Sequence, residues 1–132
     1  MFKMVHRMKI KVYYDDTDAG GVVYYANYLR YLERARTEFL SDHGINVAEV
    51  HNLGYFFTVT HVDIHYKRPA RLGDMVEVTT EMTELKNASL TLKNQILRDN
   101  ILLVEAYVTI AYIDKTGKPR RMPDDFKKIG IH

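Results

Sequence analysis

Residues 13–40, YYDDTDAGGVVYYANYLRYLERARTEFL, decide the fold, because the spacing of apolar residues changes within this segment. From Tyr25 onward apolar residues recur at steps of three and four, which places them on one stripe of a helix. They are Tyr25, Tyr28, Leu29, Leu32, Ala35, Phe39 and Leu40. The pattern predicts a helix from about Tyr24 to His43, ended by Gly44 and roughly 30 Å long at 1.5 Å per residue.

The flanking sequence predicts strands. Met8, Ile10, Val12 and Tyr14 alternate with polar or exposed positions, as in a half-buried strand. A short helical turn is expected at 47–52. Four longer runs rich in Val, Ile, Thr, Leu or Tyr follow, separated by turn residues, and they cover 55–67, 75–85, 89–98 and 101–114. Short turns between successive strands favour an antiparallel meander. The sequence therefore predicts an α+β domain, in which a long helix lies on one face of a sheet of about five strands.

The strand patterns carry three finer predictions. In 75–85, Val76 and Val78 oppose Glu77 and Thr79, so one face of that strand should be wet. In 101–114 both faces carry apolar residues, so that strand should be central and partly covered on its second face. In 55–67 the apolar positions change from odd to even near Thr60, which leaves a bulge or a stretch buried on both faces as alternatives. Apolar residues on the outer face favour an oligomer.

Bulk properties bound the function. The chain has 132 residues, enough for one domain spanning 1–132, and its net charge of +2 gives no argument for nucleic acid. With no cysteine, disulfides and thiolate chemistry are excluded. The N-terminus reads as neither signal peptide nor anchor, and no run approaches the ~20 apolar residues of a membrane helix. We expect a soluble cytoplasmic protein without membrane insertion.

The acidic turn before the helix contains more acid than a helix cap needs. Asp18 lies several residues ahead of the predicted helix, and Gly20-Gly21 indicates a positive-φ turn or close passage past something bulky. Exposed N–H groups at the helix start form a site for a carbonyl oxygen that gains negative charge. A carboxylate opposite them could attack that carbonyl or deprotonate a water molecule. The alternative is a strand that ends in an ordinary acidic capping turn.

The segment resembles the hotdog-fold acyl-CoA thioesterases of the 4-hydroxybenzoyl-CoA thioesterase group. It is closest to the YbgC-like branch, which is associated with the bacterial Tol-Pal system. The pattern D-x-D-x-x-G-x-V-Y-x-x-N-Y-x-x-Y-x-E-x-A-R is matched by Asp16, Asp18, Gly21, Val23, Tyr24, Asn27, Tyr28, Tyr31, Glu33, Ala35 and Arg36. A looser match joins Tyr66 to the turn 69–74, PARLGD. The resemblance implies a curved antiparallel sheet around a central helix, in dimers that commonly pair into tetramers.

The resemblance also implies roles for single residues. Asp18 aligns with the catalytic carboxylate of the family, and the backbone N–H of Tyr25 aligns with the donor that polarises the thioester carbonyl. Gly21, Tyr24, Lys67, Arg68 and Arg71 would contact the substrate. Relatives often carry His at the position of Tyr25, but a backbone donor survives that change. The expected substrate is an acyl-coenzyme A, so coenzyme A enters as part of the substrate, and neither a further cofactor nor a metal is expected.

Three other groups of residues could have a function. His61, Asp63 and His65 share a strand face, but the outer two lie about 13 Å apart at 3.3 Å per residue, too far to bind one metal ion. The basic residues of 67–71 and 115–121 either meet coenzyme A phosphates or form a solvated surface. Four tyrosines, Tyr24, Tyr25, Tyr28 and Tyr31, either line an acyl pocket or pack in the core and at interfaces.

Two rival functions stay open at the level of sequence. A hotdog dehydratase or hydratase would want a His near the helix start, where this chain offers only Asp18. A non-catalytic hotdog protein could bind acyl-CoA or an acyl-carrier protein, or serve as an oligomeric scaffold. The intact Asp18 favours an enzyme over this second reading.

Overall fold

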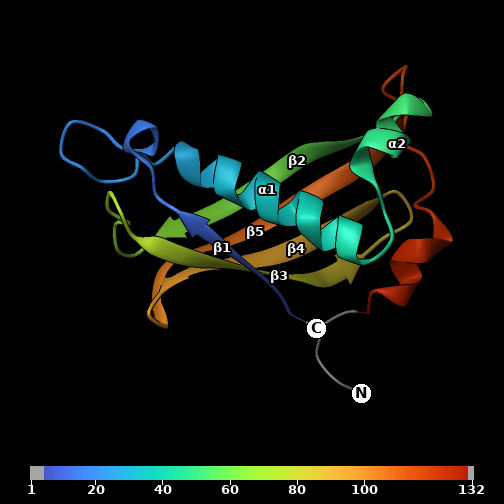
Figure 1. The fold of residues 1–132 in the computed structure, drawn as a ribbon. Coiled ribbons are helices and arrows are strands. Elements are labelled where there is room, and N and C mark those ends of the chain that lie inside the picture. The colour runs from blue at the N-terminus through green and yellow to red at the C-terminus, as the bar shows by residue number, and fades with distance from the viewer. Residues whose placement is uncertain (1–4, 131–132) are drawn as a thin grey trace.

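The computed structural model describes residues 5–130 and confirms the α+β architecture (Figure 1). Five strands form one antiparallel sheet in the order β1-β3-β4-β5-β2. The strands are β1 (His6–Lys11), β2 (Tyr55–Tyr66), β3 (Met75–Leu85), β4 (Ser89–Arg98) and β5 (Ile101–Asp114). The long helix α1 (Asn27–Asp42) lies along one face of this sheet. The short helix α2 (Val47–Asn52) follows it, and two 3₁₀ turns occupy Tyr14–Asp16 and Asp124–Lys128.

The core lies between α1 and the sheet. One stripe of the helix is fully buried and includes Tyr31, Ala35 and Phe39, as the apolar spacing predicts. Alternate residues of β3, β4 and β5 meet this stripe, with Val78, Leu92, Ile96, Val104 and Val108 at 0–1% exposure. Because every strand contributes its inward positions to one cluster, the chain forms a single hydrophobic core.

The bounds of most elements agree with the sequence prediction, whereas the start of α1 does not. We expected the helix to begin at about Tyr24, and it begins at Asn27. The backbone N–H of Tyr24 donates to the Asp16 carbonyl at 3.1 Å, so Tyr24 belongs to the preceding loop. Residues 25–27 then turn into the helix through bonds from Asn27 and Tyr28 to residues three positions earlier. The first strand also differs, because Tyr14 opens a 3₁₀ turn and β1 ends at Lys11.

The meander prediction is correct for β3, β4 and β5 and wrong for β2. Successive hairpins join β3 to β4 and β4 to β5, but β2 pairs with β5 at the far edge of the sheet. The connection 67–74 therefore does not close a hairpin; it pairs with other loops at the N-terminal end of α1. Of the two alternatives for β2, the structure shows the bulge, because the register with β5 shifts between Val59 and His61.

The outer sheet face is drier than predicted. Thr79 and Glu81 of β3 are only 7% and 8% exposed, although we expected this face to be wet. The register places Lys93 of β4 opposite Glu81, and the Thr79 hydroxyl accepts the Gln95 N–H at 3.1 Å. Long polar side chains of adjacent strands thus cover the shorter ones. β5 lies inside the sheet between β4 and β2 with Leu103 of its second face buried, as its pattern predicts.

Candidate active site

The loop 17–23 carries the acidic turn and is closed by its own backbone. Thr17 and Val23 form an antiparallel bridge, and the Asp18 N–H donates to the Val22 carbonyl at 2.9 Å. The Asp18 carbonyl in turn accepts the Gly21 N–H at 3.0 Å. These bonds form a tight hairpin with Asp18 in its first arm. The position of the Asp18 backbone is therefore well defined.

The two glycines serve this hairpin in different ways. Gly21 has φ = 75°, in the left-handed region that disfavours other residues, which confirms one of the two predicted reasons for the pair. The Gly20 N–H donates to Oδ1 of Asp18 at 2.9 Å. A Cβ atom on Gly20 would lie 3.3 Å from that same oxygen. Gly20 therefore leaves room for the Asp18 carboxylate and also orients it.

The Asp18 side chain is exposed, and within the described residues it forms no ion pair. Within residues 5–130, therefore, no salt bridge occupies the Asp18 carboxylate and prevents it from acting on a substrate. Its one hydrogen bond there, from Gly20, leaves lone pairs on both oxygens open to a ligand or a water molecule.

The start of α1 offers unpaired amides beside this loop. The N–H groups of Tyr24 and Asn27 are used, by the Asp16 and Tyr24 carbonyls respectively. Those of Tyr25 and Ala26 donate to no backbone or side-chain acceptor in the described part of the chain. Ala26 stands at the N-cap and supplies no side-chain cap, so nothing covers these donors locally. The predicted Tyr25 donor is thus free, although it lies ahead of the helix and not in its first turn.

A cavity of about 260 Å³ opens beside Tyr25. Its lining is formed by Val23, Tyr25, Tyr28, Tyr66, Lys67, Arg68 and Pro69. The ring of Tyr66 packs against those of Tyr25 and Tyr28, with centroids 6.3 Å and 5.5 Å apart. The Tyr66 hydroxyl donates to the Tyr25 carbonyl at 3.4 Å. Burial raises the pKa of the Tyr28 and Tyr66 phenols, so both stay neutral in the physiological range.

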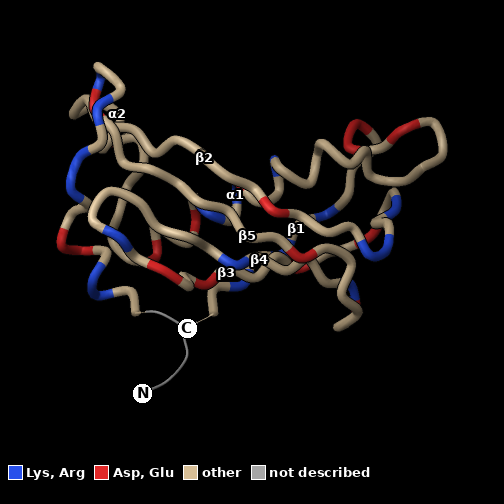
Figure 2. Tube along the Cα trace, turned by 180° about the vertical axis from the view of Figure 1, so that it is seen from behind, with Lys and Arg blue, Asp and Glu red and all other residues tan. Residues whose placement is uncertain are grey.

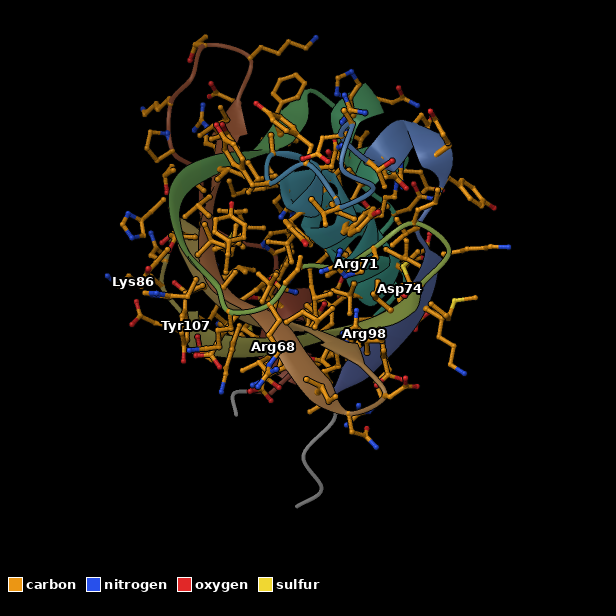
Figure 3. All side chains as sticks on the ribbon, turned by 90° about the vertical axis from the view of Figure 1, so that its left-hand side faces the viewer. Arg68, Arg71, Asp74, Lys86, Arg98 and Tyr107 are labelled. Atoms are coloured by element: carbon orange, nitrogen blue, oxygen red, sulfur yellow. The ribbon has the colours of Figure 1, made fainter. Side chains whose placement is uncertain are left out.

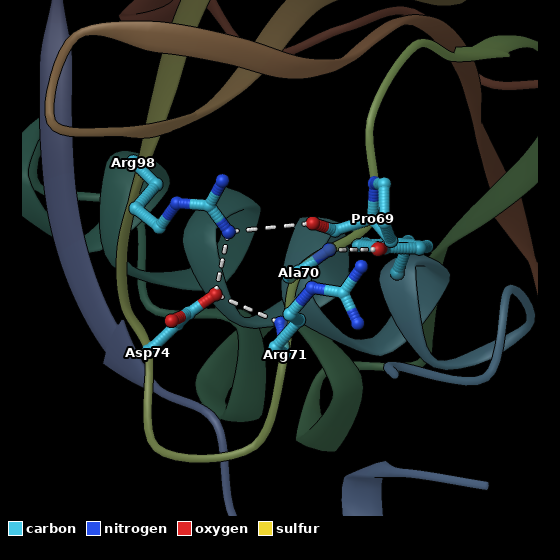
Figure 4. Close-up of polar contacts among 6 residues, drawn as sticks. Pro69, Ala70, Arg71, Asp74 and Arg98 are labelled. Carbon is cyan, nitrogen blue, oxygen red and sulfur yellow. Dashed lines mark hydrogen bonds and ion pairs between the residues drawn. The ribbon is translucent and has the colours of Figure 1, made fainter. Parts of the chain in front are cut away.

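The turn 69–74 is bonded to the Asp18 hairpin, and residues of this turn are labelled in Figures 3 and 4. Val22 bridges Arg71, and the Val23 N–H donates to the Ala70 carbonyl at 2.8 Å. The Ala70 N–H donates to the Tyr28 hydroxyl at 3.0 Å, which ties the turn to α1. Because the Asp18 hairpin rests on this turn, any group that fixes the turn also fixes the hairpin.

Arg98, at the end of β4, clamps the turn. Its Nη1 lies 2.7 Å from Oδ2 of Asp74 and donates to the Pro69 carbonyl at 3.4 Å. The same Asp74 oxygen accepts the Arg71 N–H at 2.8 Å. Burial alone would raise the pKa of Asp74, but the hydrogen bonds and charges of Arg98 and Arg71 outweigh it and hold the pKa below 3.8. Figure 3 shows Arg71, Asp74 and Arg98 grouped at the end of the molecule where α1 begins.

The structure brings together some of the predicted substrate-binding residues and separates others. Lys67 and Arg68 line the cavity with Tyr25, and Gly21 and Arg71 lie where the hairpin meets the turn. Tyr24 is 46% exposed and its ring packs at a tilt against that of Tyr25, but it does not line the cavity. Asp18 is also absent from the cavity lining. Among the described residues, the cavity therefore borders Tyr25 and does not reach Asp18.

The other candidate groups separate in the same way. Tyr28 lines the cavity, whereas Tyr31 is wholly buried in the core. The basic residues of 115–121 lie beyond the opposite end of β5, where Arg120 pairs with Asp114 at 2.7 Å. Along the Cα trace in Figure 2, the Lys and Arg positions are distributed over several segments of the chain. On β2, Nε2 of His65 lies 3.0 Å from Oδ1 of Asp63, and no group of three candidate metal ligands occurs within residues 5–130.

Sequence reasoning assigned no role to three residues that shape the site. Asn27 matched the motif, but its side chain donates to the Asp16 carbonyl, 11 positions earlier, at 2.9 Å. Tyr66 also matched, although nothing in the sequence places its ring against Tyr25. Arg98 carried no signal, since a lone arginine before an Asp-Asn turn is ordinary on a surface. Of these three residues, only Asn27 has a local sequence signal that could have been used, because it is a polar residue at the start of a helix.

Comparison with known proteins gives consistent matches over nearly the whole chain. Residues 12–129 match the Thioesterase-like superfamily. The acyl-CoA thioester hydrolase YbgC of Escherichia coli O6:H1 is 42% identical over 119 residues, which cover 89% of each chain. The acyl-CoA thioesterase YbgC of Haemophilus influenzae is 38% identical over 127 residues, 93% of this chain and 92% of the relative. The crystal structure of a probable thioesterase from Bartonella henselae superimposes with a TM-score of 0.87 at 39% identity, covering 91% of this chain and all of that one.

No helix among the described residues is long and apolar enough to span a bilayer.

Proposed function

The chain belongs to the Thioesterase-like superfamily and is an acyl-CoA thioester hydrolase with the hotdog fold, and we propose that Asp18 performs the hydrolysis. In this proposal the Tyr25 N–H polarises the thioester carbonyl. One observation carries it: the unpaired amides of Tyr25 and Ala26 lie at the same end of α1 as the exposed Asp18 carboxylate. A donor for a developing oxyanion and an ionised base or nucleophile are the two groups that acyl transfer requires.

Thioester chemistry suits a carboxylate that acts without a metal. In the general-base route, a water proton passes to Asp18, the water oxygen bonds to the carbonyl carbon, and the carbon–sulfur bond breaks. The thiolate then leaves and takes up the proton held by Asp18, which restores the carboxylate. Because a thiol has a pKa near 8.5, against about 15.7 for water, the sulfur leaves far more readily than an alkoxide would. The reaction needs no further cofactor, and coenzyme A is part of the substrate.

The residues beside the cavity suit the binding of an acyl-CoA. The tyrosine rings provide apolar surface, and Lys67 and Arg68 border the same opening with positive charge. Phosphates pair well with both side-chain types, so we assign the coenzyme A moiety to this border, with Arg71, Gly21 and Tyr24 contributing from the adjoining hairpin and turn. We expect the protein to work in the cytoplasm, where acyl-CoA substrates occur.

Oligomerisation is part of the proposal. β2 has a free edge of 12 residues, and its apolar side chains Val59 and Tyr66 are 45% and 46% exposed. An exposed edge of this length readily pairs with another chain. We infer a homodimer, with pairs of dimers as the expected tetramer. A second copy across this edge would approach the cavity from the side of Tyr66 and could extend it toward a carboxylate.

The experiment follows thiol release from a panel of aliphatic and aromatic acyl-CoAs, with wild type and with Asp18→Asn. We expect hydrolysis by wild type and a loss of roughly 10²–10⁴-fold in kcat for the isosteric variant. Equal, near-zero rates for both proteins would favour a protein that only binds acyl-CoA or an acyl-carrier protein. A single turnover in heavy-oxygen water separates the two routes, since label in the Asp18 carboxylate indicates a nucleophile.

A further inference from the structure

The Asp16 carbonyl ties together the two arms of the candidate site. It accepts the backbone N–H of Tyr24 at 3.1 Å and the side-chain amide of Asn27 at 2.9 Å. Asp16 lies two residues before the proposed catalytic carboxylate of Asp18, and Tyr24 lies one residue before the proposed amide donor of Tyr25. One oxygen atom therefore links the 3₁₀ turn that leads to the carboxylate with the turn that presents the donor.

The Asn27 side chain makes this link from the helix. Asn27 is the first residue of α1 and follows Ala26, which occupies the N-cap position where a polar side chain commonly caps a helix. Here the helix has no side-chain cap, and the Asn27 amide reaches back across the loop. This bond joins α1 directly to the segment 14–18, where the buried Tyr31 hydroxyl of α1 also approaches the Asp16 carboxylate. A movement of the helix start relative to Asp18 must therefore stretch or break this bond.

Asp16 itself is held firmly enough to act as an anchor. Its Oδ2 accepts the Tyr13 N–H at 2.9 Å. Its carboxylate also lies near the buried Tyr31 hydroxyl: burial first, and then Asp16, raise the pKa of that phenol. Asp16 is thus fixed on both its side-chain and main-chain sides, whereas Asp18 is exposed and held by neighbouring loop atoms. The Asn27 bond therefore joins the start of α1 to a residue that is fixed on both sides and lies two positions before Asp18.

We propose that Asn27 is a positioning residue, whose hydrogen bond to the Asp16 carbonyl sets the separation between the Asp18 carboxylate and the Tyr25 amide. The inference rests on the proposed function, because it assumes that these two groups act on one thioester. Catalysis by oriented groups is sensitive to small displacements, and about 1 Å can cost 10²-fold in rate. Loss of the bond should therefore lower kcat much more than it changes substrate binding.

Two substitutions remove the donor in different ways. Asn27→Asp keeps the shape and adds a negative charge at a helix start, which the helix dipole favours, so the fold should persist. Asn27→Leu removes the donor without adding charge. Asn46→Asp is the matched control, because Asn46 opens α2 and its side chain only accepts a bond, from the Glu49 N–H at 3.1 Å. An aspartate serves there equally well.

We expect both Asn27 variants to lose at least 10-fold in kcat with KM within about threefold of wild type. Their thermal midpoints should stay close to those of wild type and of Asn46→Asp. In an Asp18→Asn background, either change should have no further effect on the residual rate, because a positioning residue acts through the group that it positions. An unchanged kcat for Asn27→Leu, or a loss confined to Asn27→Asp, would overturn the proposal.

The same experiment separates this inference from the proposed function. If Asp18→Asn abolishes hydrolysis and Asn27→Leu does not affect kcat, the positioning role is wrong and the catalytic role of Asp18 stands. If Asp18→Asn retains the wild-type rate, the catalytic role itself is wrong. Additive losses in the double variant would show that Asn27 acts independently of Asp18 and would also overturn the positioning role.

Discussion

Nη1 of Arg98 lies 2.7 Å from Oδ2 of Asp74, so a residue at the end of β4 holds the turn on which the Asp18 hairpin rests (Figure 4). Both side chains are mostly buried, at 28% and 22% exposure, which distinguishes this pair from the surface ion pairs of the molecule. Since the Asp74 carboxylate also accepts the Arg71 N–H, removal of Arg98 leaves a shielded charge with one donor fewer.

The first prediction concerns this clamp. Arg98→Met should lower the free energy of unfolding by about 1–3 kcal/mol, because the partner of a shielded carboxylate is lost while the stem of the side chain is kept. Lys128→Met, which removes a cation from an exposed pair at 3.8 Å, should change it by less than about 0.5 kcal/mol. Urea titrations of the two variants measure both values. Equal effects would contradict a special role for Arg98.

The second prediction gives the pH dependence of the clamp. The pKa of Asp74 in the folded protein lies below its ordinary value of 3.8, so its ionised form stabilises the fold. That contribution is complete above the ordinary value and disappears as the pH falls through the folded value. The difference in unfolding free energy between wild type and Asp74→Asn should therefore be constant near pH 7 and shrink toward about pH 3. A difference that grows on acidification would contradict the sign of the shift.

The third prediction separates the two glycines of the hairpin. Gly20→Ala should leave the unfolding temperature nearly unchanged but lower kcat, because its Cβ would displace the exposed Asp18 oxygen from 3.3 Å. Gly21→Ala places a Cβ in open space at φ = 75°, so it should lower stability by about 1 kcal/mol through backbone strain alone. Gly21→Asn should recover part of that loss. If Gly20→Ala retained the full kcat, the orienting role of Gly20 would be wrong.

The fourth prediction concerns substrate capture. A double change of Lys67→Gln and Arg68→Gln should raise KM for acyl-CoA several-fold, with little change in kcat, because both residues border the cavity. The rise of KM with salt concentration should also become shallower in this variant. As a control, Lys127→Gln with Lys128→Gln removes the same charge from the 3₁₀ turn Asp124–Lys128, which does not border the cavity. Equal effects of the two pairs would indicate that net charge alone attracts the substrate.

The fifth prediction addresses assembly. Sedimentation velocity on wild type should show dimers or tetramers, and Val59→Glu on β2 should shift them toward monomers. A charge at this position, 45% exposed beside the free edge, would be buried without a partner on pairing. Ile101→Glu, at a similarly exposed site at the start of β5, should leave assembly unchanged. A monomeric wild type would remove β2 as an interface.

The local elements could be predicted from sequence because each carries its own period and its own turn residues. The runs 75–85, 89–98 and 101–114 match β3, β4 and β5, and Asp99 and Asn100 take the positive φ expected of a tight turn. The order of the strands could not be predicted in this way. The turn 67–74 resembles a hairpin in sequence, and only its bonds to residues 12, 21 and 23 show that it joins loops and not adjacent strands.

The same difference between local signals and long-range contacts decides which parts of the site could be predicted. Asp18, Gly21 and the basic turn stand out in the sequence because excess acid, paired glycines and clustered charge are local signals. The start of α1 was placed three residues too early, since the apolar stripe continues through Tyr25 while Tyr24 is bound to Asp16. The contacts of Asn27 and Arg98 span 11 and 24 positions, and no local pattern encodes a bond of that range.

The most direct test of the account compares Asp18→Asn with Asp15→Asn, an exposed aspartate in the preceding 3₁₀ turn. Both variants lose one negative charge, so general electrostatic effects on a polyanionic substrate are matched. We predict that Asp18→Asn still binds an acyl-CoA in calorimetry but hydrolyses it at least 100-fold more slowly, whereas Asp15→Asn keeps kcat within about twofold of wild type. Wild-type turnover by Asp18→Asn would contradict the central claim that this carboxylate carries the chemistry.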